Sequence, residues 1–530
     1  MTFKPSAKTT VSHPMTRILT LMAAALCVAH VAAQTEGNNV FGPDHILQVD
    51  IDFYSPTYWD ELLTEYDGEQ NYIPAAITIA TEVDTTTLDS VGIRLKGNSS
   101  MNHPGNKKPF KVDFNRFIPG QAYDLLKKLN FNNGFKDPTF AREKVFLDVC
   151  EGAGILAPRA TFAEVRYNGE AWGFYTVVEQ IDDQFLDRSI GDDDGMLFKA
   201  GSNFGPGSSE ASLVYEGPDA SDYGDAYELK MNESDDWSDF IGFIEFINTA
   251  SDEQFENELG DHLDLQAYLR SAALDNLFAN LDSYTLSARN YYLYQNTTLG
   301  RWQWIKWDCN EAFGSYAMGV PGDMTELDVE FDGGNYDRPL LERVLANENL
   351  KNAYLAEMCE LRELYFNSEY LDPRLDAIQA LIQNAVYNDD NKMYSNADFA
   401  TNFDNNLNTG GPGGGGGAGG SLYGLHSFVS ERSAFVANEV DCTALNAPES
   451  HREPNLAVFP NPASSWIFVQ WNDESLHGDM TLFSISGQSV QKWQNVTSGS
   501  HLVIDVSEGL YMLRLELGTS FVTKPLQVVR

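Results

Sequence analysis

The sequence predicts an α+β fold with two lobes, followed by a small all-β sandwich. Strand-like segments surround one helical segment in the first third of the chain, and apolar residues at helical spacing dominate after Leu263. Short alternating segments separated by turn residues fill the region from Asn455 to Arg530. The chain has 530 residues, which is more than one compact core supports, so several domains are expected.

The N-terminal elements are read from alternating apolar residues and from turn chemistry. The expected strands are "HILQVDIDF", "YIPAAITIA", "DSVGIRLKG" and "KPFKVDF", and the expected helix is "FAREKVFLDVCEGAG". The segments "TFAEVRYNG" and "WGFYTVVEQID" form a hairpin in this interpretation, because Asn168 and Gly169 suit a tight turn.

The pattern becomes helical from Leu263 onward. Leu274, Leu277, Phe278 and Leu281 recur at i, i+3, i+4 and i+7, which places them on one helix face. An aromatic hairpin, "NYYLY" and "RWQWIKW" joined by "QNTTLG", follows, and then helices to about Val386. The segment "LYGLHSFVSERSAFVANEV" is one further amphipathic helix.

Compositional breaks give the domain boundaries. The large domain is predicted to span 46–442, with the glycine-rich loop 410–420 inserted in it because a helix follows that loop. Residues 443–454 form a polar linker, and 455–530 form the β-sandwich.

Charge and the N-terminus both indicate export. Residues 1–33 read as a secretory signal peptide, with an apolar run after Arg17 and small residues before a cleavage point at Ala33. The formal net charge of −42 makes nucleic acid an improbable partner. No later segment is long and apolar enough for a transmembrane helix.

Four cysteines remain after the signal peptide: Cys150, Cys309, Cys359 and Cys442. Their wide spacing matches no zinc pattern, and four cysteines allow three pairings. One or two disulfides suit an exported protein, and buried free thiols are the alternative.

Polar residues lie at the open end of the aromatic hairpin. If its two strands pair, Asn290 and Asp308 return close together, and their oxygens could share one Mg²⁺ ion. Asp282 precedes the hairpin and could accept a proton from a substrate hydroxyl. The alternative is that Asp282 and Asn290 cap turns while Asp308 begins a loop.

The N-terminal half supplies cations. In "KPFKVDF", Lys111 alternates with apolar residues and therefore projects from the opposite strand face, where a nucleotide could lie. "RLKGNSS" ends a strand in a glycine and serine turn beside Arg94 and Lys96, which could cover phosphates. Glu143 could pair with Lys111. Solvated strand and helix faces are the alternative for each of these residues.

The segments "RLKGNSS…KKPFKVDFN", "GFYTVVEQIDDQFLDR", "LDNLFANLDSYTLSARNYYLY" and "WQWIKWDCNEAFG" resemble the spore-coat protein H (CotH) kinase-like family, in order, over about 48–440. The resemblance implies a two-lobed, atypical protein-kinase-like domain that uses ATP and Mg²⁺, with Mn²⁺ as a substitute. It implies Asp282 as the catalytic residue, and Asn290 and Asp308 as metal ligands. It also implies nucleotide binding by Lys111, Arg94 and Lys96, with Glu179 near the nucleotide.

Two departures from the family pattern are visible. The family motif often reads Trp-Asp-x-Asp, whereas this chain has "WDCN", so Asn310 provides an amide without charge. The separation between Asp282 and Asn290 also exceeds that of the ordinary kinase loop, so the extra residues must loop out.

The tail resembles a second family. "LAVFPNPASSWIFVQW", "LFSISGQSV" and "VSEGLYMLRLE…KPLQVVR" are similar to the type IX secretion sorting domain of Bacteroidetes-type bacteria. This resemblance implies that the β-sandwich is Ig-like and that the type IX export machinery recognises it, with a secreted or cell-surface location.

The sequence therefore predicts an exported kinase that transfers the γ-phosphoryl group of ATP to a hydroxyl of an extracellular protein. A non-catalytic surface protein for adhesion or matrix assembly is the main alternative. A carbohydrate-directed enzyme using paired carboxylates such as Asp282 and Asp308 is a third.

Overall fold

The computed structural model describes residues 36–529 except 43, 82–83, 202–208, 233–235, 409–420, 444, 446–455, 460, 462, 472–476, 485–488 and 518–519. The predicted signal peptide, the glycine-rich loop and most of the predicted linker therefore lie outside the described residues.

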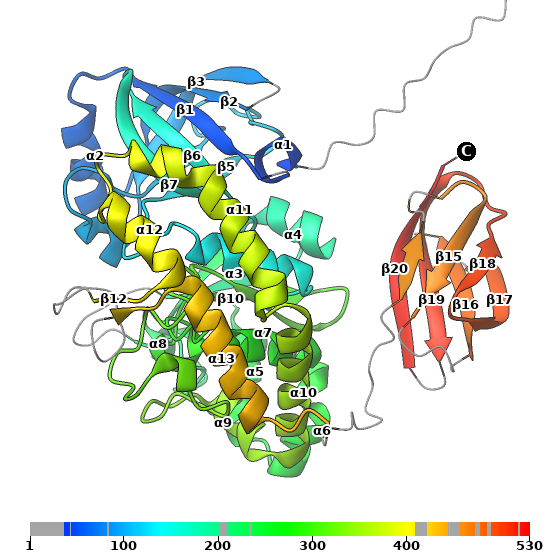
Figure 1. Ribbon diagram of the computed structural model, residues 1–530. Helices are drawn as coiled ribbons and strands as arrows, with labels where there is room; N and C mark the ends of the chain where they lie inside the picture. The colour runs from blue at the N-terminus through cyan, green and yellow to red at the C-terminus, as the bar shows by residue number, and fades with distance from the viewer. Residues whose placement is uncertain are drawn as a thin grey trace, which may run out of the picture.

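The N-terminal half forms a closed barrel with strand order β1-β2-β3-β4-β5-β7-β6 (Figure 1). Its strands are β1 (Ile46–Phe53), β2 (Ile73–Ala80), β3 (Thr85–Leu95), β4 (Phe110–Asp113), β5 (Lys128–Asn132), β6 (Ala160–Tyr167) and β7 (Glu170–Glu179). β1 closes the barrel by pairing with β6 in parallel, from Ile46 opposite Phe162 to Ile51 opposite Tyr167. The buried residues of β1, β2 and β4 alternate, so their apolar side chains fill the barrel interior.

The sequence-predicted N-terminal strands and the β6–β7 hairpin are confirmed. Asn168 and Gly169 both have positive φ, at 50° and 82°, as a primed hairpin turn requires. Closure into a barrel was not predicted. Neither were two short helices that pack near it, α1 (Asn38–Phe41) and α2 (Tyr58–Asp67), nor the 3-10 turn η1 (Ser99–Asn102).

The second half is built on a four-stranded sheet with order β11-β10-β8-β9, covered by helices around a second hydrophobic core. Its strands are β8 (Leu197–Ala200), β9 (Tyr227–Met231), β10 (Tyr291–Asn296) and β11 (Arg301–Lys306). The predicted aromatic hairpin is confirmed: β10 and β11 pair antiparallel, with Tyr291 opposite Lys306.

Helices make up most of the rest of this half (Figure 1). They are α3 (Arg142–Gly152), α4 (Asp183–Ile190), α5 (Ser238–Thr249), α6 (Asp252–His262), α7 (Leu265–Leu277), α8 (Tyr284–Ser287), α9 (Pro339–Ala346), α10 (Glu348–Leu364), α11 (Ser368–Tyr387), α12 (Asn396–Asp404) and α13 (Leu425–Glu439), with 3-10 turns η2 (Ala220–Tyr223) and η3 (Met324–Glu326) and the short pair β12 (Leu407–Asn408) and β13 (Ser421–Leu422). The helix predicted over "FAREKVFLDVCEGAG" is confirmed as α3. The mainly helical region begins with α5 at Ser238, earlier than Leu263, from which the sequence predicted it.

One buried ion pair joins the two halves. Lys107, in the segment before β4, lies 2.6 Å from Asp389, which follows α11, and both side chains are buried. Asp389 also accepts hydrogen bonds from the backbone N–H groups of Phe174 on β7 and of Asn391. This carboxylate therefore fixes the end of α11 against the barrel.

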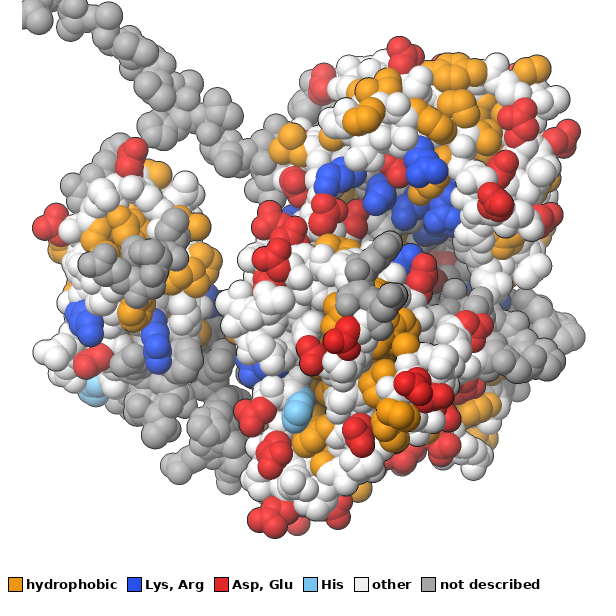
Figure 2. All heavy atoms as spheres, turned by 180° about the vertical axis from the view of Figure 1, so that it is seen from behind, with side chains coloured by type: hydrophobic (Ala, Val, Ile, Leu, Met, Phe, Trp, Pro, Cys, Tyr) orange, Lys and Arg blue, Asp and Glu red, His pale blue; other side chains and the backbone are white. Residues whose placement is uncertain are grey.

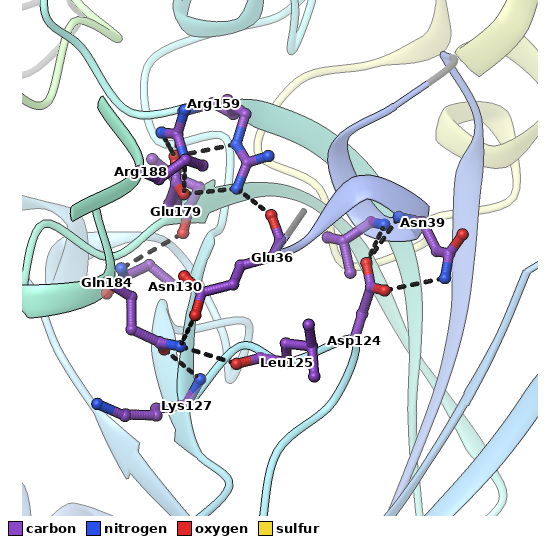
Figure 3. Close-up of polar contacts among 12 residues, drawn as sticks. Glu36, Asn39, Asp124, Leu125, Lys127, Asn130, Arg159, Glu179, Gln184 and Arg188 are labelled. Atoms are coloured by element: carbon purple, nitrogen blue, oxygen red, sulfur yellow. Dashed lines mark hydrogen bonds and ion pairs between the residues drawn. The ribbon is translucent and has the colours of Figure 1, made fainter. Parts of the chain in front are cut away.

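The residues before β1 also dock on the barrel. Asp124 accepts hydrogen bonds from Asn39, through both its backbone and its side chain, and Arg159 donates to the carbonyl oxygen of Glu36 (Figure 3). The folded unit therefore begins before residue 46, where the sequence placed the start of the domain.

The sequence left open disulfides and buried free thiols, and the structure contains both. Cys359 and Cys442 form a disulfide, which ties α10 to the residues after α13. Cys150 and Cys309 are free and buried.

The C-terminal region is all-β, as predicted. It contains a sheet of order β14-β15-β18 and a sheet of order β17-β16-β19-β20, which share one apolar core. The strands are β14 (Ala457–Phe459), β15 (Trp466–Gln470), β16 (His477–Ser484), β17 (Ser489–Thr497), β18 (Ser500–Val503), β19 (Gly509–Leu517) and β20 (Ser520–Val528). An Ig-like arrangement of these strands stays a prediction. No helix in the described ranges is long and apolar enough to cross a membrane.

Candidate functional site

A cavity of about 450 Å³ is lined by residues from both halves of the large domain. β3, β4 and β5 contribute from the barrel, and β8 and the open end of the β10–β11 hairpin contribute from the other half. Figure 2 shows lysine and arginine side chains gathered in a hollow of this face, whereas acidic side chains predominate around it. Such a positive hollow in a chain with net charge −42 attracts anions.

The cations come from adjacent strands. Arg94 on β3 lies opposite Lys111 on β4 in the strand register, and both line the cavity together with Lys96 and Lys199. Lys111 lies on the face opposite Phe110 and Val112, as the alternation predicted. Burial, together with neighbouring cations, holds the pKa of Lys111 well below its ordinary value.

These ammonium groups have few negative partners. In the described part of the chain, Lys111 makes no ion pair or hydrogen bond, and Lys96 donates one long hydrogen bond of 3.4 Å to Asn130. Burial lowers the pKa of Lys96 to about 8 and also lowers that of Lys199. Lys111, which has no direct ion pair, is costly to keep charged in this partly buried position, and an anionic ligand would relieve that cost.

The turn after β3 covers one side of the cavity. Gly97 has φ of +90°, and a Cβ there would lie 2.3 Å from the Ser100 hydroxyl, so glycine is required. Tyr66 on α2 donates to the carbonyl oxygen of Gly97 at 2.8 Å, and Asn133 donates to that of Ser100 at 3.2 Å. The glycine and serine turn predicted from the sequence is therefore held in place from two sides.

The hairpin brings the predicted metal ligands to the same end of the cavity. Asn290 immediately precedes β10, and Asp308 lies two residues after the end of β11. Asn290 donates through Nδ2 to the carbonyl oxygen of Asp282 at 2.7 Å, so its Oδ1 is the atom available as a ligand. The short helix α8 accommodates the extra residues between Asp282 and Asn290.

Asp282 lines the cavity, and its buried Oδ1 has no hydrogen-bond partner among the described residues. Burial raises the pKa of Asp282, and the nearby Asp308 carboxylate adds to the increase, whereas Ser287 and Arg289 oppose it. A carboxylate with a raised pKa is the better proton acceptor near neutral pH.

The pairing suggested for Glu143 differs from the one observed. Glu143 accepts a hydrogen bond from Asn132 at 2.8 Å, and the cation that acts on its charge is Lys96 rather than Lys111. Burial is the main reason that the pKa of Glu143 is raised, and Asp308 adds to the effect.

Glu179 is not among the residues that line the cavity, although the family resemblance placed it near the nucleotide. Both of its carboxylate oxygens bind arginines instead, Arg159 at 2.6 Å and Arg188 at 2.7 Å (Figure 3). Thr176 and Gln180, on β7 and just after it, line the cavity. β7 therefore reaches the cavity, but the Glu179 carboxylate binds Arg188 of α4 and Arg159, which contacts the N-terminal segment.

Several lining residues were not selected from the sequence. Lys199 lies on the unpredicted strand β8, and Tyr66 lies on the unpredicted helix α2. Glu311 follows directly after the quoted "WDCN", and its adjacency to that motif was the available indication.

The residues present fit a divalent cation bound together with phosphate. Carboxylate and amide oxygens are the protein ligands that Mg²⁺ uses, usually one or two of them, with the remainder from water and phosphate. The unpartnered buried oxygens of Asp282 and Glu311 lie at this end of the cavity. Among the described residues, no group of three or more His, Cys, Asp or Glu side chains is placed to hold a metal ion, so a cation here would also need amide, water or phosphate oxygens.

The fold and the site together define an α+β protein with a cationic cleft that faces an end lined by carboxylates and amides. The chain belongs to the family described as CotH kinase protein, whose model matches residues 93–435. Residues 457–529 match the model described as secretion system C-terminal sorting domain, which supports secretion or a surface location.

Two curated proteins are similar in sequence to this chain. Inner spore coat protein H of Bacillus subtilis is 29% identical over 285 residues, covering 53% of this chain and 74% of that protein. Invasin CotH3 of Rhizopus delemar is 21% identical over 350 residues, covering 62% of this chain and 57% of that protein.

Among solved structures, the proinflammatory kinase CtkA of Helicobacter pylori is similar over 70% of this chain and 94% of its own, at 9% identity and a TM-score of 0.25.

Proposed function

We propose that this protein is an exported protein kinase that transfers the γ-phosphoryl group of ATP to a hydroxyl of an extracellular protein acceptor. The observation that carries the proposal is the joint position of Lys111 and Arg94 at one side of the cavity and Asp282, Asn290 and Asp308 at the other. Phosphoryl transfer needs both cations for the phosphates and a carboxylate for the attacking hydroxyl.

In this proposal, Arg94, Lys96 and Lys111 bind the phosphates and offset their charge. Asn290 and Asp308 would hold Mg²⁺, or Mn²⁺ in its place, which when bound neutralises charge on the phosphate oxygens. Asp282 orients the acceptor hydroxyl and takes its proton. The hydroxyl oxygen then forms a bond to the γ-phosphorus while the bond to the bridging oxygen breaks, releasing ADP.

The signal peptide, the type IX route and the sorting domain belong to the same proposal. The tail match supports recognition by an export system. The disulfide between Cys359 and Cys442 suits an oxidising location outside the cytosol.

Ligand-dependent thermal unfolding tests the nucleotide site first. ATP at about 100 times its dissociation constant should stabilise the folded protein by about 2.7 kcal/mol when Mg²⁺ is present. We expect Asp308→Ala to lose the Mg²⁺-dependent part of this shift. Asp187→Ala, an exposed aspartate on α4 outside the cavity, is the matched control and should behave like the wild type.

Phosphoryl transfer is then measured as ADP formation and label transfer to dephosphorylated casein, a general acceptor. Asp282→Asn should keep the thermal shift but lower the rate by roughly 100-fold or more. If neither Mg²⁺ nor Mn²⁺ supports any shift at millimolar ATP, the kinase proposal is wrong and a non-catalytic surface protein becomes the better explanation.

A further inference from the structure

Glu311 is a buried carboxylate at the end of the cavity where Asn290 and Asp308 lie. It follows Asp308 by three residues, is 5% exposed and lines the cavity. Its Oε1 accepts a hydrogen bond from Lys136 at 3.2 Å, whereas its Oε2 is buried and has no partner among the described residues. An ionised oxygen that is buried without a partner requires a cation or a donor.

The neighbours of Glu311 do not supply a second positive charge at Oε2. Asp282 and Asp308 both lie close enough for their negative charges to act on it, and Lys136 is the cation bound to it. Three carboxylates therefore lie within electrostatic range of one another at this end of the cavity, where Lys136 binds Glu311 and Arg289 acts on Asp282.

The proposed metal ligands carry little negative charge. It contains one carboxylate, Asp308, and the amide of Asn290, and Asn310 lines the cavity with a second amide. Mg²⁺ and Mn²⁺ are hard cations whose affinity for a site rises with the number of charged oxygen ligands. Two amides and one carboxylate neutralise only half of a divalent charge.

We propose that Glu311 is a metal ligand, which binds the divalent cation through Oε2 together with Asp308 and replaces the carboxylate that Asn310 does not provide. This inference rests on the proposed function, because it concerns the cation of the same site. The competing role is purely structural, in which Glu311 serves only to neutralise Lys136.

Mn²⁺ binding to the purified protein without nucleotide separates the two roles, because the free ion is counted directly by electron paramagnetic resonance. Glu311→Gln should weaken Mn²⁺ binding roughly tenfold or more. The double variant Asn310→Asp/Glu311→Gln returns a carboxylate to the site and should recover most of the loss. Lys136→Met removes a competing cation and should leave Mn²⁺ binding unchanged or tighter.

A control is needed to show that weaker Mn²⁺ binding by Glu311→Gln does not come from a folding defect. Glu311→Gln leaves the partly buried Lys136 with a weaker partner, so the pair variant Lys136→Met/Glu311→Gln is included, and the thermal unfolding of each protein is recorded without metal. The pair variant should bind Mn²⁺ as weakly as Glu311→Gln alone.

Wild-type affinity in Glu311→Gln or in the pair variant overturns the proposal, as does a failure of Asn310→Asp to restore binding. The absence of any Mn²⁺ binding by the wild type, with and without ATP, also overturns it. If Mn²⁺ binds through Glu311 but ATP causes no thermal shift, the metal site stands and the kinase proposal fails.

Discussion

Replacing Asp389 by alanine should lower the free energy of unfolding of the large domain by about 4 kcal/mol. Breaking a buried ion pair by removing one partner costs about 3–5 kcal/mol, because the other charge stays buried without compensation. The side chains of Lys107 and Asp389 are 0% and 1% exposed, so solvent cannot replace the missing partner. Asp389→Ala also leaves the N–H groups of Phe174 and Asn391 without their acceptor.

Removing the other partner, Lys107, should lower the free energy of unfolding by less. After Lys107→Met, Asp389 keeps the hydrogen bonds from Phe174 and Asn391, and the thioether can occupy the space between the rings of Phe140 and Tyr175 that now surround the ammonium group. We expect a loss of about 2 kcal/mol for Lys107→Met. The double variant should lose less than the sum of the two single losses, by about 1–3 kcal/mol, because the two residues are in direct contact.

Urea unfolding followed by tryptophan fluorescence measures these differences. Asp390→Ala, the exposed neighbour in sequence, is the matched control and should change stability by less than about 0.5 kcal/mol. The reasoning is refuted if Asp389→Ala is as stable as this control, or if the two single losses add fully in the double variant.

Three further predictions concern the cavity and the disulfide. Lys111→Met should weaken ATP binding roughly tenfold or more in a titration assay, since hydrogen bonds to charged groups contribute about 1.5–3 kcal/mol; Lys127→Met, a surface lysine outside the cavity, should bind ATP normally. The affinity for ATP should fall as the pH rises from 8 to 9.5. Burial lowers the pKa of Lys96 to about 8 in the free protein, and a bound phosphate raises the pKa of Lys96 again, so ATP binding takes up a proton over this range. An affinity that stays constant between these pH values would contradict the prediction. The variant Cys359→Ser/Cys442→Ser should lose about 4–5 kcal/mol of stability, as expected for a loop closed between cysteines 83 residues apart, and reductant should destabilise the wild type but not this variant.

Local patterns explain which parts of the site could be predicted from the sequence. The β10–β11 hairpin is set by neighbouring residues, so the positions of Asn290 and Asp308 at its open end follow from the strand pairing alone. Strand alternation likewise places Lys111 on the face opposite Phe110 and Val112.

Nonlocal contacts explain what the sequence could not show. Closure of the barrel depends on pairing between β1 and β6, which are separated by more than one hundred residues and carry no complementary pattern. The role of Glu179 depends on two arginines, Arg159 and Arg188, that reach it from different elements. Lys199 becomes part of the cavity because β8 joins β10, and no motif surrounds it.

The way in which the barrel closes also has a practical consequence for cutting the protein into pieces. A fragment limited to residues 93–435, the range matched by the family model, would lack β1, β2 and most of β3. β6 would then become an open edge with unpaired backbone groups, and the apolar barrel interior would be uncovered on one side, which favours aggregation. The same fragment would also leave Cys359 without its partner. Recombinant versions of the large domain should therefore run from Glu36 to at least Cys442, since the stretch that defines the family is shorter than the stretch that folds.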